Sequence, residues 1–333
     1  MSGRYRRLAL LLGVVALFLA GCHYEQKISL TGQFPTPMVA VTLAGSPKAE
    51  GKVALIEVQG FIGMERGFCL GSCEPAVVPA VVARLKEVES DGGFAAVLLK
   101  FNTPGGSVTA SDILYQEIAA FKERTGLPVI AYMEGLCASG GVYAAMAADR
   151  IIAHPTTITG SIGVILQQVN IAGLLDKIGV DMTPVKSGDF KDMGSPFRSP
   201  TPEENALMQD IIAQMHQRFA DTVAAARHLP REEVDRFADG RVFLAHQALE
   251  YRLIDGEGAF DDAFSAAAAA AGRDKNDLRL VAWRTKESYQ DTVYGPASTG
   301  ATGVSLAAAW LISRLDGLDD TGLYYLWPAW ITK

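Results

Sequence analysis

The stretch PVIAYMEGLCASGGVYAAMAA, residues 128–148, decides the fold. Residues 128–132 form an apolar run of the kind that fills strands buried on both faces of a sheet. The small residues 141–148 predict a helix. Ser139 lies in the turn between the two elements. Its side chain is therefore expected at the edge of the sheet, beside the amino terminus of the helix.

The alternation of strand and helix continues on both sides of this stretch. The apolar patterns predict strands at residues 53–58, 95–99 and 150–153, and helices at residues 79–88 and 110–123. Strands that alternate with helices are typical of an α/β fold with a mostly parallel sheet and flanking helices.

A long helix is predicted to begin at Thr201. Thr201 and Glu204 can form a capping box, and Pro202 suits the first helical position. Apolar side chains then recur at a spacing of four, which predicts core or subunit interface rather than a site. They are Leu207, Ile211, Met215, Phe219 and Val223.

The composition is that of a globular protein. The chain has 333 residues, of which 49% are hydrophobic and 20% charged, and this balance argues against disorder. Its net charge is −7, and no basic cluster lies outside the amino terminus. The sequence therefore predicts no nucleic-acid partner.

The amino terminus has the pattern of an export signal. Three arginines at positions 4, 6 and 7 precede an uncharged apolar run that is shorter than the roughly 20 residues of a spanning helix. The run ends in Leu-Ala-Gly-Cys at residues 19–22, which resembles a bacterial lipobox. We therefore predict a signal peptide at residues 1–21 and lipid on Cys22. A short membrane anchor with a chance cysteine is the alternative.

The predicted location is the bacterial cell envelope, with the body lipid-anchored and facing the periplasm. His23 follows the cysteine, where the usual inner-membrane retention signal has an aspartate, so the outer membrane is favoured. Residues 22–51 are predicted to be a tether and residues 52–280 the folded body. Residues 281–333 are predicted as a C-terminal extension, with a flexible link at 295–303 and a short helix at 306–315.

Three cysteines remain in the exported chain. Cys69 and Cys73 lie in a glycine-rich segment, and the oxidising compartment favours a disulfide between them. Zinc binding is the weaker alternative, because no second ligand pair follows. Cys137 is interpreted as a small buried core residue. The sequence predicts no metal and no cofactor.

A serine becomes a nucleophile only when a base takes its proton, and no histidine lies near Ser139. Lys191 can serve if a dry pocket lowers its pKa, with Lys186 as a nearby competitor. Ser161, in another small-residue turn, can hydrogen-bond and aim a lysine amine. Gly106 follows a buried strand, and its backbone N–H can point into a site.

Plainer interpretations stay open for each of these residues. Ser139 can be an ordinary N-cap serine, and Ser161 and the glycine loop can be simple turns. A Ser-His-Asp triad using His154 or His246 is a rival mechanism. However, Ser139 lacks the Gly-x-Ser-x-Gly elbow of the α/β-hydrolases.

Together these segments resemble the signal peptide peptidase SppA family, peptidase family S49. The resemblance covers roughly residues 52–258, and several ordered motifs carry it. They are FNTPGG at 101–106, ASGGVY at 138–143, TGSIG at 159–163, GDFKD at 188–192 and DGRVF at 239–243.

The resemblance implies a ClpP/crotonase-like fold and a serine–lysine endopeptidase. Ser139 matches the nucleophile, Lys191 the general base and Ser161 the residue that orients the lysine. Gly106 matches the backbone oxyanion donor, and Gly140 is a helper. The family also implies a homo-oligomeric ring, a dyad that can be completed across subunits, and extended apolar peptides such as released signal peptides as substrates.

The chain departs from the family pattern in a few places. Residues 252–255 read Arg-Leu-Ile-Asp where the family usually has Gly-Leu-Val-Asp, and a lipid anchor replaces the usual transmembrane helix. An outer-membrane location would separate the protein from signal-peptide remnants. Two other function classes stay open: a catalytically silent scaffold or binding module, and a crotonase-type acyl-CoA enzyme.

Overall fold

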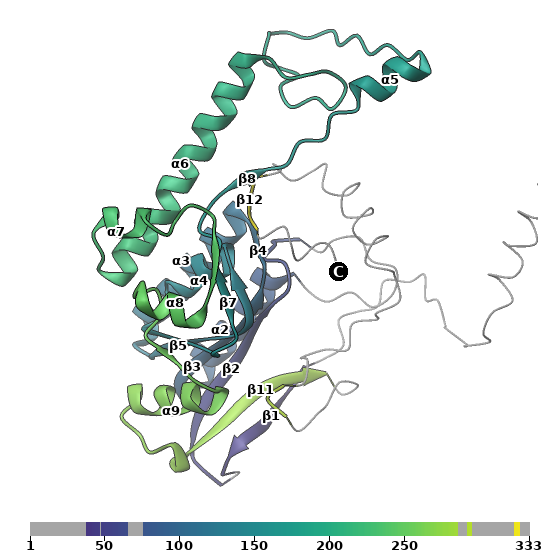
Figure 1. Cartoon of the computed structure of the whole chain (residues 1–333). Helices are drawn as coiled ribbons and strands as arrows, with labels where there is room; N and C mark the ends of the chain where they lie inside the picture. Colours follow the sequence, from purple (N-terminus) through teal and green to yellow (C-terminus); the bar gives the residue numbers. More distant parts are fainter. Residues whose placement is uncertain (1–37, 47, 66–75, 286–291, 295–322, 327–333) are drawn as a thin grey trace, which may run out of the picture. The chain divides into compact units, whose positions relative to one another are not determined.

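Strands β2 (Gly51–Gln59), β3 (Phe94–Thr103) and β5 (Val129–Ala138) lie side by side at the centre of a parallel sheet (Figure 1). The computed structural model describes residues 38–46, 48–65, 76–285, 292–294 and 323–326, which all fall within one compact unit. The apolar runs predicted at 53–58, 95–99 and 128–132 form the buried parts of these three strands.

Further strands extend the sheet on both sides. β11 (Leu278–Thr285) pairs parallel to β2, and β1 (Met38–Gly45) pairs antiparallel to β11. On the other side, β6 (Arg150–Ala153) and β10 (Gly256–Glu257) continue the parallel order from β5. The predicted α/β fold with a mostly parallel sheet is therefore confirmed.

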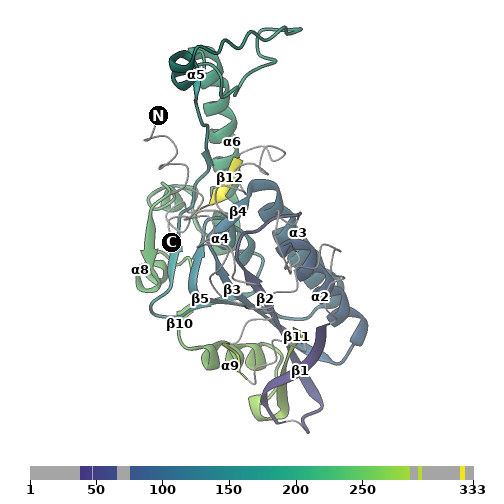
Figure 2. The ribbon, with the colours of Figure 1, turned by 90° about the vertical axis from the view of Figure 1, so that its right-hand side faces the viewer.

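Successive side chains of each buried strand point to opposite faces of the sheet. Helices cover both of these faces. Val97 and Leu99 of β3 join the core beneath α2 (Val77–Asp91), α3 (Val108–Thr125) and α4 (Gly140–Ala145). Ala96 and Leu98 face the opposite side, against α9 (Phe260–Ala270). Figure 2 shows α9 on one side of the sheet and α2 and α3 on the other.

The predicted long helix is α6 (Pro202–Arg227), and its capping box is confirmed. The Glu204 N–H donates to Thr201 Oγ1 at 3.2 Å, and the Thr201 N–H donates to the Glu204 carboxylate at 2.8 Å. The apolar stripe divides along the helix. Phe219 and Val223 are buried in the core, whereas Leu207 is 45% exposed.

The exposed end of α6 belongs to a projecting segment, residues 167–211, which we call the arm. The arm contains α5 (Ala172–Ile178) and the first part of α6, and Figure 1 shows it extending away from the sheet. The last part of α6 packs on α4 and on α7 (Arg231–Asp235). The helix therefore connects the arm to the body.

The folded part begins earlier and ends later than the sequence predicted. β1 lies inside the predicted tether, and β11 crosses the predicted boundary after residue 280. β1 is an edge strand whose side chains are exposed or half-buried, so it lacks the continuous apolar run that reveals a buried strand. The C-terminal boundary fails because β11 is buried almost throughout, as a strand inside the sheet must be.

A small second sheet lies beside the first. It has the order β4 (Gly105–Ser107), β12 (Leu323–Leu326), β8 (Ile165–Leu166), with antiparallel pairing throughout. A short branch of the main sheet, β7 (Ile158–Gly160) and β9 (Val242–Leu244), pairs with the end of β5 and leads into α8 (Ala245–Glu250). A 3-10 turn at Lys275–Asp277 precedes β11.

Several predictions fall outside the described residues. They concern the signal peptide, Cys22, Cys69, Cys73, the link at 295–303 and the helix at 306–315. In the part of the chain that the structure describes, no helix has the length and apolar character needed to cross a membrane.

Candidate active site

Ser139 lies at a sharp turn between β5 and α4, as the sequence predicted. β5 ends at Ala138 and α4 begins at Gly140, so one residue makes the reversal. Ser139 has a φ angle of 53°, which is unusual for a residue with a side chain. Its N–H donates to the Gly160 carbonyl at 2.8 Å, and this bond fixes the turn against β7.

Ser161 makes a matching turn beside Ser139. In the parallel pair β5–β7, Ala138 is opposite Gly160, so the two serines are the next residues on adjacent strands. Ser161 also has a φ of 53°, and its N–H donates to the Arg241 carbonyl at 2.7 Å. Each such backbone conformation costs about 1–3 kcal/mol, and residues in these conformations cluster at functional sites.

Gly106 of β4 and Gly140 of α4 lie next to each other in space. A Cβ atom on Gly140 would lie 3.2 Å from the Gly106 nitrogen and 2.2 Å from Ser111 Oγ. A Cβ on Gly106 would lie 2.0 Å from the Ile62 carbonyl oxygen. Only glycine fits at either position, and the close approach brings the Gly106 backbone to the start of α4.

The Ser139 hydroxyl is buried without a partner. The residue is 0% exposed, and its Oγ has no hydrogen-bond partner among the described residues. A buried polar atom left unpaired costs about 1–3 kcal/mol, so native proteins rarely keep one without a functional reason. No side chain of the described part of the chain is therefore placed to accept the proton of this hydroxyl.

A strand of the chain's own C-terminal part lies over this site. In the register of the second sheet, Tyr325 is opposite Gly106, and Tyr324 is opposite both Ser107 and Ile165. The Tyr324 ring meets Phe61 edge-on, with ring centroids 6.1 Å apart. β4 and β8 therefore form the two sides of a groove that accepts an extended chain between them.

Lys191 lies on the arm, in the segment between α5 and α6. It is exposed, and its side chain makes no hydrogen bond or ion pair with the described residues. The backbone N–H of Lys191 donates to the Gly188 carbonyl at 3.1 Å, and this bond holds a local turn. Ser139 and Lys191 are therefore not brought together within one chain.

Lys186, the competing lysine, is committed to an ion-pair network. Its Nζ donates to Asp192 Oδ1 at 2.7 Å and to the Asp189 carbonyl at 2.9 Å. Arg198 binds both Asp192 and Glu204, and these bonds hold the pKa of the Asp192 carboxyl well below its usual range and lower that of Glu204 to about 2. The Lys186 amine is therefore part of the arm's own structure, whereas the Lys191 amine has no such partner among the described residues.

The histidines that offered a rival mechanism lie elsewhere. His154 Nδ1 is 2.8 Å from Thr156 Oγ1, and His246 is exposed beside Glu250 and Glu257. His216 bonds the Ala238 carbonyl. None of them bonds Ser139, so the described residues contain no Ser-His-Asp triad at this serine.

Cys137 is a core residue and takes no part in the chemistry of the site. Cys137 is fully buried, and burial raises the pKa of its thiol far above the usual range, so it stays protonated and unreactive. The described residues hold no group of three or more His, Cys, Asp or Glu side chains that could bind a metal ion. The interpretation of Cys137 as a core residue is confirmed.

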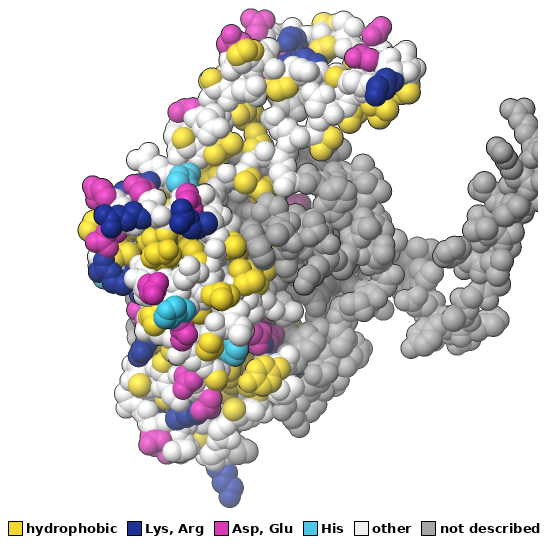
Figure 3. Space-filling model, in the orientation of Figure 1, with side chains coloured by type: hydrophobic (Ala, Val, Ile, Leu, Met, Phe, Trp, Pro, Cys, Tyr) yellow, Lys and Arg dark blue, Asp and Glu magenta, His cyan; other side chains and the backbone are white. Residues whose placement is uncertain are grey.

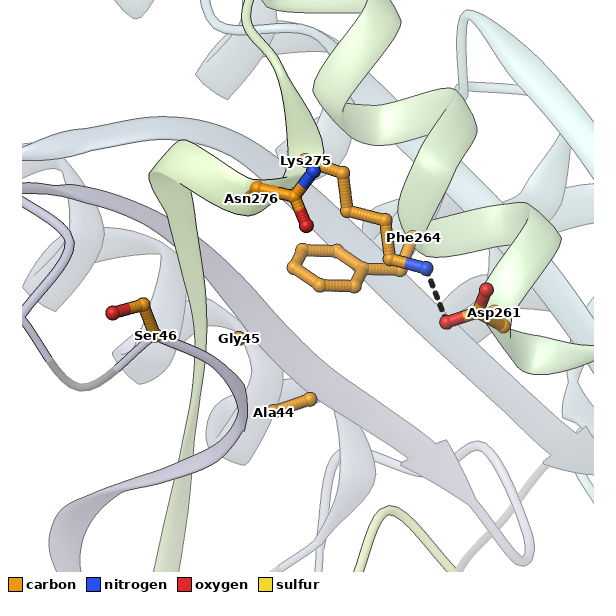
Figure 4. A pocket seen from close by; sticks show the side chains of 7 residues that line it. All are labelled: Ala44, Gly45, Ser46, Asp261, Phe264, Lys275 and Asn276. Carbon is orange, nitrogen blue, oxygen red and sulfur yellow. Dashed lines mark hydrogen bonds and ion pairs between the residues drawn. The ribbon is translucent and has the colours of Figure 1, made fainter.

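A surface hollow of the described residues lies far from the residues of the candidate site. It has a volume of about 350 Å³ and lies between the end of β1 and helix α9. Figure 4 shows Lys275 extending past the Phe264 ring to its ion-pair partner Asp261, which closes one side of the hollow. None of the residues singled out by the sequence lines it, so it is not part of the candidate site.

Two supporting features of the site escaped sequence reasoning. The DGRVF motif at 239–243 builds the second turn, because the Arg241 carbonyl accepts the Ser161 N–H and β9 pairs with β7. Tyr143, in the same motif as Ser139, is buried on α4, and its hydroxyl makes hydrogen bonds to residues of α3 and α6. The motif spacing identified both segments, but only the fold shows what they contact.

The arrangement suits attack by a hydroxyl on a carbonyl group. The Ser139 side chain is placed at the end of a strand, and the Gly106 and Gly140 backbones lie close together at the start of α4. The position between β4 and β8, which β12 occupies, has the pairing geometry that an extended peptide needs. A base is the one component that the described part of a single chain does not place at the serine.

Comparison with known proteins agrees with this chemistry. The family model for peptidase family S49 matches residues 121–274, which include Ser139, Ser161 and Lys191. A Synechocystis protein provisionally named as a protease is 40% identical over 69% of this chain and 78% of its own length. A protein from Enterococcus faecium, provisionally named signal peptide peptidase SppA, is 36% identical over 64% of this chain and 61% of its own length.

Other matches are more partial. Protease 4 of Salmonella typhi is 34% identical over 63% of this chain, but the match spans only 32% of that protein. Among solved structures, a point mutant of ClpP1 from Listeria monocytogenes matches 63% of this chain and 93% of its own, with a TM-score of 0.42 and 18% identity. The extent of the Synechocystis match and the family model together show that the chain belongs to peptidase family S49, the SppA family, and is a peptidase.

Proposed function

We propose that the protein is a serine endopeptidase with a Ser139–Lys191 dyad completed between two copies of the chain. The observation that carries the proposal is the Ser139 hydroxyl, which is held at a strained turn, buried, and without a hydrogen-bond partner among the described residues. Ser161, on the adjacent strand end, would orient the lysine amine. Gly106 and Gly140 would supply the oxyanion donors.

The proposed mechanism has two halves. Neutral Lys191 takes the Ser139 proton as Oγ attacks the peptide carbonyl, and the backbone N–H groups bind the resulting oxyanion. The lysine then gives its proton to the leaving amine, and an acyl-enzyme ester forms. A water molecule, deprotonated by the same lysine, attacks the ester and releases Ser139 with its proton restored.

A second copy of the chain is the proposed source of the lysine. The arm carries many exposed apolar side chains, which a monomer would leave in water. Figure 3 shows such side chains on the arm. They are Val169, Leu174, Ile178, Val180, Met182, Val185, Phe190, Phe197 and Leu207. Packing of one arm on the neighbouring body would bury this surface and generate a homo-oligomeric ring if the rotation closes.

The arm also leaves the Lys191 amine available for a neighbouring chain. The Asp192–Arg198–Glu204 network fixes the segment to the start of α6 and leaves the Lys191 amine without a partner among the described residues. Transfer of that amine into the buried pocket at Ser139 would remove it from water. Desolvation lowers a lysine pKa and makes the neutral, proton-accepting form available.

Mixing two inactive chains tests completion across subunits. Co-expression of Ser139→Ala with Lys191→Ala chains is expected to restore activity to about a quarter of wild type, because random assembly in a heterologous ring gives one intact site in four. Peptide hydrolysis by the purified mixed oligomer is the measurement. Each variant alone is the matched control. A silent mixture with native oligomeric size would rule out a dyad shared between chains.

The proposed substrate is an extended apolar peptide, such as a released signal peptide. The groove between β4 and β8 accepts a strand that pairs on both edges, as β12 does. Main-chain pairing of this kind gives affinity without strict sequence selection. The name of the Enterococcus faecium relative supports signal peptides as a substrate class. The same groove argues against an acyl-CoA ligand, as does membership of a peptidase family.

We also propose that the protein is a lipoprotein of the bacterial cell envelope, with its body facing the periplasm and the outer membrane favoured. The support is the sequence at residues 1–23 alone. Replacement of Cys22 by serine is expected to move the protein from the membrane fraction to the soluble fraction, because an acyl chain contributes about 0.8 kcal/mol per buried methylene.

Fractionation of cells followed by mass measurement of the amino terminus checks that prediction. Ser139→Ala serves as the control, because it changes the proposed active site and leaves Cys22 in place. A Cys22→Ser protein that stays in the membrane with an uncleaved amino terminus would show a membrane anchor instead of a lipobox. The pairing of Cys69 with Cys73 stays a prediction.

A further inference from the structure

Tyr143 is built into the turn that carries Ser139. It lies on α4, four residues after the serine, and its N–H donates to the Ser139 carbonyl at 3.0 Å. Its side chain is almost fully buried. The backbone of Tyr143 therefore helps to fix the serine, and its ring anchors α4 in the core.

The Tyr143 hydroxyl reaches a second helix. It donates to Asp112 Oδ1 at 2.5 Å, and Asp112 lies on α3, which begins directly after β4 and Gly106. Burial, with the Asp112 carboxylate as a second cause, raises the pKa of Tyr143 to about 12. The hydroxyl therefore stays protonated at neutral pH and keeps donating to the carboxylate.

The same two side chains meet a third helix, α6. Arg218 donates to Asp112 Oδ1 from Nε at 3.1 Å and from Nη2 at 2.7 Å. Thr222 Oγ1 lies 3.2 Å from the Tyr143 hydroxyl, and the Phe219 ring packs edge-on against the Tyr143 ring at 5.1 Å. These α6 residues belong to the helix that carries the arm.

We propose that Tyr143, through Asp112 and Arg218, is a positioning residue that sets the base of α6 against the Ser139 turn. The inference rests on the proposed function, since it matters only if Ser139 reacts and the arm delivers Lys191. The start of α6 is about 26 Å from Phe219 at 1.5 Å per residue. A small rotation at the base therefore becomes a large displacement at the end of the arm.

Loss of the Tyr143 hydroxyl should affect the chemical step more than substrate binding. The peptide groove is formed by β4 and β8, and neither strand contains a member of this cluster. Misplacement of a catalytic group by about 1 Å can cost on the order of a hundredfold in rate. Because Phe keeps the ring and its packing, we expect Tyr143→Phe to lower kcat about tenfold and to leave KM nearly unchanged.

The experiment measures kcat and KM for an apolar peptide with the full-length oligomer. The matched control is Tyr115→Phe, because Tyr115 is on α3 and its ring meets Tyr143 edge-on at 5.6 Å, yet its hydroxyl has no bond within the described residues. We expect wild-type kcat from this control. Asp112→Asn and the double variant complete a cycle in which the two changes should be far from additive.

The outcomes separate this inference from the proposed function. Ser139→Ala is assayed in parallel, and if it keeps activity the proposed function fails whatever Tyr143 does. If Ser139→Ala is inactive and Tyr143→Phe has wild-type kcat, only the positioning role is overturned. A Tyr143→Phe protein whose activity falls only in proportion to lost thermal stability or oligomer would have a structural role, which also overturns it.

Discussion

Replacement of Ser139 by alanine is expected to reduce peptide hydrolysis by on the order of 10⁴-fold or more, as removal of a nucleophile does in other serine peptidases. Lys191→Ala is expected to have an effect of similar size, because Lys191 is the proposed base and no described side chain of the same chain hydrogen-bonds the Ser139 hydroxyl. Both variants should keep the wild-type fold. Hydrolysis of extended apolar peptides by full-length protein in detergent is the measurement.

The arm offers a matched control for the lysine. Lys186 is five residues away, but its amine is paired with Asp192 at 2.7 Å. Lys186→Ala should therefore retain most of the activity, with at most a small loss from a looser loop. An active Lys191→Ala enzyme would exclude the dyad and direct attention to His154 or His246.

If the wild-type, correctly assembled protein cleaves no peptide, the chain acts as a scaffold or binding module within its family. The Ser139→Ala result would then carry no information on mechanism. Binding of an apolar peptide to the groove between β4 and β8 would be the next property to measure, because that surface does not depend on the dyad.

The sequence predicts the central strands well, because a strand that is buried on both faces has a continuous run of apolar residues. Residues 150–153 form β6 within the predicted limits, and the Thr201 capping box is present as expected. In both cases the local pattern and the tertiary environment require the same structure. β1 has no such agreement: it is half-exposed, and only its pairing with β11 makes it a strand.

The candidate site is predictable in its parts but not in its assembly. The turn at Ser139 and the glycine at 106 have local signatures, so their motifs could be identified from the sequence. The matching turn at Ser161 acquires meaning only from the register that places Gly160 beside Ala138. Lys191 lies on the arm, and its place relative to the body depends on the long helix α6, which no local pattern around the lysine encodes.

Strand β12 is expected to compete with an added peptide for the groove between β4 and β8. Ser139 is 0% exposed while β12 fills the groove between β4 and β8. A tethered strand competes with a free peptide at an effective concentration on the order of millimolar. Removal of residues 323–333 is therefore expected to raise kcat/KM for an added peptide by about tenfold or more, mainly through a lower KM.

A backbone substitution tests the same competition without shortening the chain. Proline at 325 removes an N–H from a strand that pairs on both sides, so Tyr325→Pro should release β12, whereas Tyr325→Phe keeps the backbone and should behave as wild type. If both the truncation and the proline variant leave KM unchanged, β12 does not compete with substrate. If both lose activity, β12 completes the groove instead of blocking it, and substrate must enter beside the strand. A lower KM in both, with kcat unchanged, would show that the chain's own C-terminal strand and the substrate occupy one place.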